Sequence, residues 1–300
     1  MIKRTLYFGN ACYLCKKDDQ LYISYPDDEK EAVTIPIEDI GIVILDNPQI
    51  TLTHALMVAL SENNAAVISC NGSHLPYSLM LPMHSHHAFT EKMSRQIESS
   101  LPLRKNMWMQ TVVAKIRNQA ALLNALGEDN KRLLRLAEKV KSGDPENVEG
   151  QAASYYWDRL FILSEGFMRH RSGPPPNNLL NYGYAVLRAV IARNLSASGL
   201  FLALGIHHHN KYNPYCLADD IMEPFRPFVD ALVLEVMQEQ DDISELTPGI
   251  KKKLLSVPTV DIRIDGEKSP LMVGAQRTSA SVAACFEGSA RKILYPETPF

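Results

Sequence analysis

Apolar and polar positions follow two different periods in the two parts of the chain. Before about residue 75, short segments rich in β-branched and aromatic residues alternate with turn-forming residues, as strands do. After residue 87, apolar residues recur every three or four positions, which is typical of amphipathic helices. We therefore expect an α+β fold with a small N-terminal β-sheet or sandwich domain and a larger all-α catalytic domain. The expected boundaries are 1–76 for the β domain, 77–87 for a linker and 88–300 for the helical domain.

Individual elements follow from the same patterns. The expected strands are 5–8, 21–24, 33–37, 41–45 and 65–69. One helix is expected within the β domain, over 51–62, with Thr51 or Thr53 as its N-terminal cap. In the second domain we expect helices within 88–140 and over 147–169, 178–198, 217–240 and 274–292. Gly199 should close the third of these, and Pro224 and Pro227 should kink or restart the fourth.

Composition indicates a folded protein of enzyme size. The 300 residues are 46% hydrophobic, which is enough to bury one large core or two smaller ones. The first residues contain no apolar core typical of a signal peptide, and no apolar run approaches the roughly 18 residues that span a bilayer. We expect a soluble, cytoplasmic protein that has no membrane partner.

The cysteines do not form a recognisable metal motif. Five are scattered along the chain, at Cys12, Cys15, Cys70, Cys216 and Cys285. The first two form a single CxxC without the second pair that would complete a tetrahedral zinc site. We interpret them as ordinary thiols on a strand, in a reducing compartment.

Charge is distributed unevenly, although the net charge is only −3. Residues 76–141 contain eleven Lys/Arg and five Asp/Glu, whereas residues 219–247 contain one and nine. An acidic segment next to basic ones binds a polyanion only when cations bridge part of it. On charge alone, ordinary solvated helix faces explain this distribution as well as a surface that binds a polyanion does.

One segment combines groups that could hold a metal ion. Within 205–227, three consecutive histidines precede the acids Asp219, Asp220 and Glu223. Each aspartate is three or four positions before Glu223, so two carboxylates could share one helix face. Carboxylates with an imidazole suit Mg²⁺ or Mn²⁺. Surface histidines and helix-capping acids are the alternative, while the absence of an HExxH motif argues against a zinc hydrolase.

A further acid, Glu149, begins a predicted helix after an Asp-Pro-Glu-Asn loop. The small residues Ala152, Ala153 and Ser154 follow it and leave room for a bulky substrate beside the carboxylate. An acid in a first helical turn also commonly offsets the helix dipole. Spacing alone does not choose between these interpretations.

Four ordered segments resemble the integrase family of CRISPR adaptation. They read ITLTHALMVALSENNAAVISCN, NVEGQAASYYW, NNLLNYGYAVLRAVIARNLSASGL and HHHNKYNPYCLADDIMEPFRPFVD. The last is most similar to the form found with type II systems. The resemblance extends from the first strand to the terminal ILYPETP, which is nearly the whole chain.

The resemblance implies a specific metal site. By motif position the family's three ligands correspond to Glu149, His208 and Glu223, with Mg²⁺ or Mn²⁺ as cofactor. His208 is preferred over its neighbours because the ligand histidine of the family stands three positions after Gly205, where a helix is expected to end. Asp220 becomes an outer or auxiliary acid, which could also contact a second ion. His207 and His209 are candidates for the base that removes the proton from the attacking hydroxyl.

The resemblance also implies a reaction and a set of partners. The 3′-hydroxyl of a short DNA duplex, the new spacer, would attack a phosphodiester at the repeat array. Family members form homodimers through their β domains and join a small ferredoxin-like second adaptation protein in a heterohexamer. In type II systems the RNA-guided effector nuclease and a ring-shaped accessory protein take part. The alternative is a scaffold of the same complex that binds DNA without catalysis.

Basic residues in the helical domain are candidates for contacts to DNA phosphates. Such contacts would make DNA binding depend on salt without reading the bases. The candidates are Lys92, Arg95, Arg104, Lys105, Lys115, Arg117, Arg188, Lys211 and Arg277. For any single one of them, ordinary surface charge is the alternative.

Overall fold

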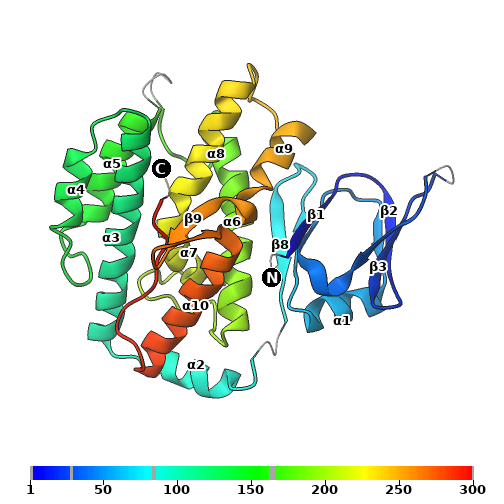
Figure 1. Cartoon of the computed structure of the whole chain (residues 1–300), viewed down its shortest axis with the longest axis horizontal. Coiled ribbons are helices and arrows are strands. Elements are labelled where there is room, and N and C mark those ends of the chain that lie inside the picture. Colours follow the sequence, from blue (N-terminus) through cyan, green and yellow to red (C-terminus); the bar gives the residue numbers. More distant parts are fainter. Residues whose placement is uncertain (1–2, 28–29, 83–85, 162–166, 299–300) are drawn as a thin grey trace. The chain divides into compact units, whose positions relative to one another are not determined.

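The protein divides into a β-rich unit and a helical unit. The computed structural model describes residues 3–27, 30–82, 86–161 and 167–298, and the chain divides into compact units after His87 (Figure 1). The first unit is built on sheets and the second mainly on helices, so the predicted α+β class is confirmed. In the described part of the chain, every helix is too short or too polar to cross a membrane.

Two four-stranded sheets form the first unit. One contains β1 (Arg4–Phe8), β5 (Ile40–Leu45), β7 (Ala66–Cys70) and β8 (Pro76–Met80), in that order. The other contains β4 (Val33–Pro36), β3 (Gln20–Ser24), β2 (Cys12–Lys17) and β6 (Ile50–Leu52). The five predicted strands all coincide with observed ones. Strand β5 lies between two parallel neighbours, which explains its nearly continuous apolar run.

A short 3₁₀ turn, η1 (Ile37–Asp39), and helix α1 (His54–Glu62) complete this unit. Of the two predicted caps of α1, Thr53 is the one observed, because its side chain accepts a hydrogen bond from the Leu56 amide. Leu56 and Leu60 on α1 pack into one core with Leu14 and Val43 from the two sheets. Cys12 and Cys15 lie on β2, as expected for thiols on a strand.

The predicted linker begins too early. Residues 76–80 form β8, which pairs with β7 from Val67–Met80 to Cys70–Pro76. The segment is half exposed and contains a proline, so its side chains give little sign of a strand. Its hydrogen bonds to β7 nevertheless fix it in the sheet, and the prediction of a linker was wrong over residues 77–80.

Helices make up most of the second unit. They are α2 (Phe89–Ile97), α3 (Leu101–Ala125), α4 (Lys131–Ala137), α5 (Val148–Leu160), α6 (Asn177–Ala197), α7 (Cys216–Met222), α8 (Arg226–Glu239), α9 (Pro248–Leu254) and α10 (Leu271–Glu287). Short 3₁₀ turns, η2 (Glu223–Phe225) and η3 (Val257–Thr259), and a hairpin of β9 (Asp261–Ile264) and β10 (Glu267–Pro270) complete it.

Two long helices organise the helical unit. Helix α6 is buried along most of its length and packs against α7, α8 and α10 (Figure 1). Helix α3 packs against α4, α5, α8 and η2. Pro224 and Pro227 lie where α7 passes through η2 into α8, so the predicted kink is confirmed. Because α3 packs against both α5 and η2, it faces the two elements that carry the predicted acidic ligands.

Three predictions for this unit need correction. The unit is not wholly helical, because β9 and β10 form an antiparallel hairpin. Asp265 and Gly266 adopt the positive φ angles of the tight turn between these strands. Helix α5 ends at Leu160 rather than 169, since residues from 167 fold back onto the start of α6, where Arg169 binds Asn177. Part of that predicted helix, 162–166, lies outside the described residues. The last helix, α10, ends at Glu287 rather than at 292, because Gly288 follows it with a φ of 80°.

Candidate functional site

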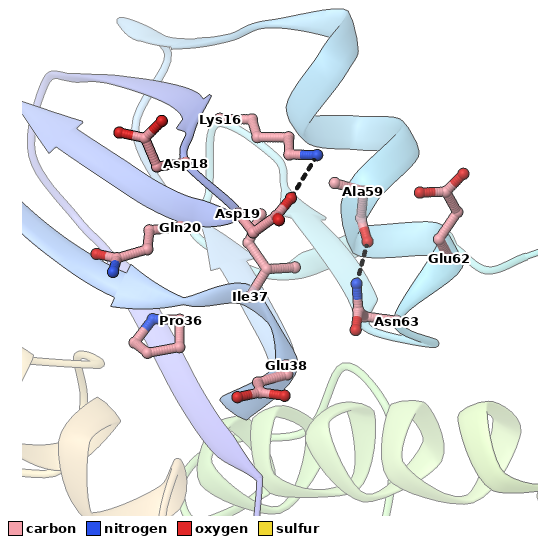
Figure 2. Close-up of a pocket in the computed structure, with 10 residues that line it drawn as sticks. All are labelled: Lys16, Asp18, Asp19, Gln20, Pro36, Ile37, Glu38, Ala59, Glu62 and Asn63. Atoms are coloured by element: carbon pink, nitrogen blue, oxygen red, sulfur yellow. Dashed lines mark hydrogen bonds and ion pairs between the residues drawn. The ribbon is translucent and has the colours of Figure 1, made fainter.

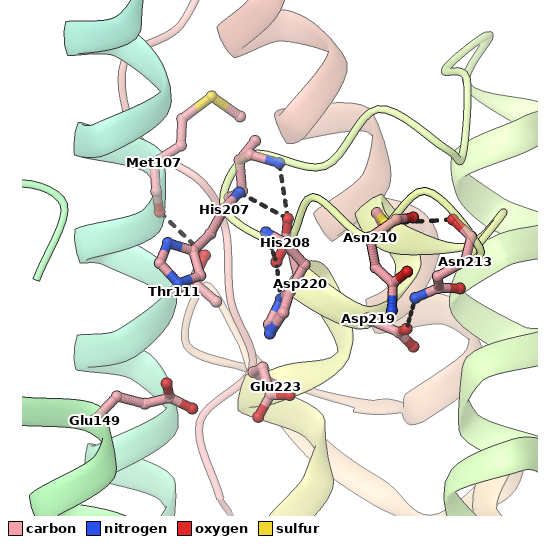
Figure 3. A network of polar contacts seen from close by, with 12 residues as sticks. Met107, Thr111, Glu149, His207, His208, Asn210, Asn213, Asp219, Asp220 and Glu223 are labelled. Atoms are coloured by element: carbon pink, nitrogen blue, oxygen red, sulfur yellow. Dashed lines mark hydrogen bonds and ion pairs between the residues drawn. The ribbon is translucent and has the colours of Figure 1, made fainter. Parts of the chain in front are cut away.

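Glu149, His208 and Glu223 come from three separate segments of the helical unit. Glu149 is in the first turn of α5, His208 is in the loop between α6 and α7, and Glu223 begins η2. Figure 3 shows their side chains directed into one region, with the His208 ring above Glu223 and the Glu149 carboxylate pointing toward both. The three predicted ligands, distant in sequence, are therefore neighbours.

Two polar residues position Glu149 at the start of α5. The carboxylate of Asp144 accepts hydrogen bonds from the amides of Val148 at 2.8 Å and Glu149 at 3.0 Å. Asn147 adopts a left-handed conformation, and its side chain accepts from the Gly150 amide. These bonds satisfy amides that the first helical turn leaves without backbone partners. They fix the direction in which Glu149 leaves the helix.

Asp220 holds the loop that carries His208. Its fully buried carboxylate accepts hydrogen bonds from the amides of Ile206, His207 and His208, at 2.7, 2.9 and 3.2 Å. The Nδ1 of His208 donates to the same carboxylate at 2.5 Å. Because one carboxylate gathers four donors, the backbone around His208 and the plane of its ring are fixed together.

Gly205 allows this loop to pass close to Asp220. A Cβ at this position would lie 2.4 Å from the His208 carbonyl oxygen and 2.7 Å from the Asp220 Oδ2. The sequence suggested instead that Gly205 ends a helix. That expectation was wrong, since α6 ends at Ala197 and Gly199, with a φ of 79°, follows it. Close packing is the reason for glycine at 205.

The hydrogen bond to Asp220 determines which nitrogen of His208 is available. Since Nδ1 is directed at Asp220, Nε2 is left to face the glutamates, the arrangement that orients many metal-binding histidines. The same bond raises the pKa of His208, although burial opposes the shift. With both its oxygens engaged, Asp220 acts on His208, and a direct metal-ligand role for it does not follow from this geometry.

The expected pairing of Asp219 or Asp220 with Glu223 on one helix face is not observed. Asp219 turns toward Arg188 and Asn213, each at 2.6 Å. Asp220 turns toward the histidine loop (Figure 3). Side chains three or four residues apart share a face only while the helix continues, and here α7 gives way to η2 at Glu223.

Lys115 lies between the two glutamates. Its Nζ is 2.5 Å from Oε1 of Glu149 and 2.6 Å from Oε2 of Glu223, and the residue is only 8% exposed. Lys115 was predicted from the sequence to contact DNA. That interpretation was wrong for this structure, because the ammonium is buried against carboxylates and does not face solvent.

A second cation pairs with the other carboxylate oxygen of Glu223. The Nε of Arg226 is 2.8 Å from Oε1 of Glu223. Burial by itself raises the pKa of Glu223, but Arg226 and Lys115 outweigh it and lower the pKa to about 2. Burial also disfavours the charged form of Lys115, which by itself lowers its pKa. The two glutamates more than reverse that shift, so the pKa of Lys115 is raised. Glu223 is therefore charged, and both glutamates contact the Lys115 ammonium.

The donor set fits a hard divalent cation. Two carboxylate oxygens converge on one positive charge, and an imidazole nitrogen is held beside them. Among the described residues, no three His, Cys, Asp or Glu side chains yet stand close enough together to hold a metal ion. The Lys115 ammonium occupies the point at which the two glutamates meet.

The neighbouring histidines have different surroundings. The His207 ring stacks on Trp108 of α3, with ring centroids 4.1 Å apart and planes 3° apart. Burial lowers the pKa of His207, and the adjacent His208 adds to the shift. His209 is exposed. His207 thus packs against the wall of the site as a neutral ring.

The candidate DNA contacts fall into two groups. Besides Lys115, three are engaged in ion pairs within the protein: Lys92 with Glu287, Arg188 with Asp219, and Arg277 with Asp265 and Glu267. Lys211 instead lies over the ring of Tyr212, which is 81% exposed, in the same loop as His208. Arg95 lies on α2, and the others, Arg104, Lys105 and Arg117, lie on α3. Lys211 is the candidate nearest in sequence to the site.

A cavity of about 510 Å³ in the first unit is lined by more acidic than basic residues (Figure 2). Its lining includes four acids, Asp18, Asp19, Glu38 and Glu62, and one lysine, Lys16, which pairs with Asp19 at 2.8 Å. Such a surface repels a polyanion. We therefore place the candidate active site in the helical unit.

Comparisons with known proteins show which family this chain resembles. The family model described as CRISPR associated protein Cas1 matches residues 6–245. The CRISPR-associated endonuclease Cas1 of Neisseria meningitidis serogroup C (strain 8013) is 36% identical over 300 residues, covering 99% of this chain and 97% of that protein.

Two solved structures share the fold. A casposase bound to an integration product superposes with a TM-score of 0.80 at 20% identity, covering 98% of this chain and 92% of the other. A chain of a Cas6-RT-Cas1–Cas2 complex gives 0.74 at 17% identity, covering 99% of this chain and 36% of the other.

Proposed function

Because the chain belongs to the Cas1 family of CRISPR-associated proteins, we propose that it joins new spacers to the repeat array as a divalent-metal-dependent DNA integrase. The observation that carries this proposal is the convergence of Glu149 and Glu223 on one cation beside a histidine held by Asp220. A site of this kind suits phosphodiester chemistry, which depends mainly on positioning and on neutralising charge.

Glu149, His208 and Glu223 would hold Mg²⁺ or Mn²⁺. The ion would lower the pKa of the attacking 3′-hydroxyl and offset charge on the phosphate. In the transfer, the 3′-oxygen of the spacer bonds to phosphorus while the bond from phosphorus to the 3′-oxygen of the repeat strand breaks. The number of phosphodiester bonds is unchanged, so the joining step needs no external energy source.

The protein's own residues have distinct tasks in this proposal. Asp220 keeps the Nδ1 of His208 protonated and its Nε2 directed at the site. Arg226 holds one oxygen of Glu223, which leaves the other directed toward Glu149. Asp144 and Asn147 fix the helix turn that carries Glu149. Basic residues around the site, with Lys211 foremost, would hold the DNA backbone.

We propose double-stranded DNA and the second adaptation protein as partners in the cytoplasm. The Cas6-RT-Cas1–Cas2 complex that shares the fold of this chain supports an assembly of this kind. Residues 1–76 would pair two copies of the chain, and two dimers with the small ferredoxin-like protein would form the heterohexamer. The type II effector nuclease and the ring-shaped accessory protein would join it during spacer selection.

The test is a joining assay with matched variants. The protein, its partner subunit, a repeat plasmid, duplex DNA and Mn²⁺ should give joined products. Glu149→Gln, His208→Ala and Glu223→Gln should each abolish joining while circular dichroism shows an intact fold. Glu146→Gln is the control, since this exposed glutamate lies just before α5 and pairs with exposed Lys141.

The alternatives give different results in the same experiment. Joining at the normal rate in all three site variants would reject the assignment. Tight DNA binding in EDTA with no joined or nicked product in any divalent metal would favour the non-catalytic scaffold. Stoichiometric zinc in the purified protein would favour a zinc hydrolase.

A further inference from the structure

We propose that Lys115 is an internal cation that keeps the two ligand carboxylates together and that a divalent ion must displace. Lys115 would therefore set the metal affinity of the site. This inference rests on the proposed metal-dependent function and adds a residue to it that the ligand set does not contain.

The Lys115 ammonium links three elements of the helical unit. Lys115 is on α3, Glu149 is on α5 and Glu223 begins η2. The ammonium lies 2.5 Å from Glu149 and 2.6 Å from Glu223. Without it, two carboxylates would face each other across a partly buried space and repel. Lys115 thus supplies the positive charge that the glutamates require when no metal is bound.

The ammonium and a divalent ion compete for the same oxygens. A metal ion held by both glutamates needs the oxygens that Lys115 now contacts, and two cations at one point repel each other. Binding of the ion must therefore move the ammonium away. The work of moving it lowers the apparent affinity for the metal.

Lys115, rather than Arg226, is the cation that moves. The Arg226 guanidinium lies 4.5 Å from the centroid of the Tyr184 ring and also pairs with Glu223 from three residues away on the same segment. Its contacts with both groups fix it in place. Lysine instead carries a point charge on a flexible four-carbon chain, which can swing without moving α3.

The experiment is a Mn²⁺ titration of the full chain without DNA, in which electron paramagnetic resonance measures the free ion. Lys115→Met keeps the length of the side chain and removes its charge, so it should bind Mn²⁺ about tenfold more tightly or better. Lys115→Arg keeps the charge and should show no such gain. Lys252→Met removes a charge from an exposed lysine on α9 and should match the wild type.

A thermal measurement covers the case in which the metal-free variant is poorly folded. A ligand that binds only the folded state raises the melting temperature of the protein. At a given ligand concentration, the rise is larger when the ligand binds more tightly. The rise produced by saturating Mn²⁺ should be larger for Lys115→Met than for the wild type. An equal or smaller rise would contradict the proposal.

The outcomes separate this inference from the proposed function. If Glu149→Gln and Glu223→Gln weaken Mn²⁺ binding but Lys115→Met leaves it unchanged or weaker, the metal site stands and the role of Lys115 is overturned. If no form of the protein binds Mn²⁺, both are overturned. Tighter binding in Lys115→Met that is lost on adding Glu223→Gln supports both.

Discussion

The Nδ1 of His208 donates a hydrogen bond to the Oδ1 of Asp220 at 2.5 Å, and Asp220 also gathers the amides of residues 206–208. One buried carboxylate therefore determines both the course of the loop and the orientation of the imidazole. If His208 is a metal ligand, its affinity for the ion should depend on a residue that does not touch the ion.

We therefore predict that Asp220→Asn weakens Mn²⁺ binding by about 10- to 100-fold, the range typical of residues that orient a metal-binding histidine. The asparagine NH₂ would also meet backbone amides that need an acceptor, so the melting temperature should fall. Titration with Mn²⁺ and thermal unfolding would measure the two effects. Asp219→Asn is the matched control, because the neighbouring carboxylate binds Arg188 and Asn213 instead. Wild-type affinity in Asp220→Asn would show that His208 needs no such support.

The second prediction separates His207 from His208. Because His207 stacks on Trp108 and burial lowers its pKa, its role should be to pack as a neutral ring. His207→Phe preserves an aromatic ring against Trp108, so joining should stay within about tenfold of wild type. His208→Ala should abolish it. A loss above a hundredfold in His207→Phe, with unchanged Mn²⁺ affinity, would instead make His207 the base.

The third prediction concerns DNA binding. Each phosphate contact contributes about 0.9 to the slope of log K against log salt concentration. Lys211→Ala, in the exposed loop beside the site, should lower that slope by about one and weaken binding equally for different sequences. Lys92→Ala should change it less, since Lys92 pairs with Glu287 at 2.6 Å. Fluorescence anisotropy across a salt series would measure both, and an unchanged slope in Lys211→Ala would remove it from the interface.

Parts of this structure follow directly from local sequence. Five strand segments and the long helices were predictable, since alternation and the 3.6-residue period depend on which face is buried. Strand β8 was not, because a half-exposed PYSLM segment becomes a strand only through its pairing with β7. The end of α5 was missed for a similar reason, since Asn177 holds the following residues on the start of α6.

The candidate site was also predictable only in part. Motif resemblance brought Glu149, His208 and Glu223 together, while helix spacing wrongly paired the aspartates with Glu223. Asp219 and Asp220 are adjacent on α7 and point in different directions, which spacing to a third residue could not reveal. Lys115 looked like one of many basic residues on an amphipathic helix. Only the packing of α3 against α5 and η2 shows that it is buried between two acids.

The last prediction concerns Asp230, a buried acid behind the site. Its carboxylate accepts hydrogen bonds from the hydroxyls of Tyr156 at 2.7 Å and Tyr184 at 2.5 Å. Burial raises the pKa of Asp230 from 3.8 to about 6, although the two tyrosines and the nearby arginines oppose the shift. The folded protein therefore holds this proton more tightly than the unfolded chain does.

The sign of the pH dependence follows from that difference. A raised pKa in the folded state stabilises the fold fully below pH 3.8, and this stabilisation is lost as the pH rises to about 6. Each unit of pKa shift corresponds to about 1.4 kcal/mol in the free energy of unfolding. Because other acids titrate in the same range, Asp230→Asn, which cannot ionise, should be compared with the wild type by urea unfolding between pH 4 and 7. Relative to Asp230→Asn, the wild type should lose stability as the pH rises through this window and then level off. A difference between the two proteins that stays constant with pH would show that Asp230 ionises at the same pH in the folded and unfolded states.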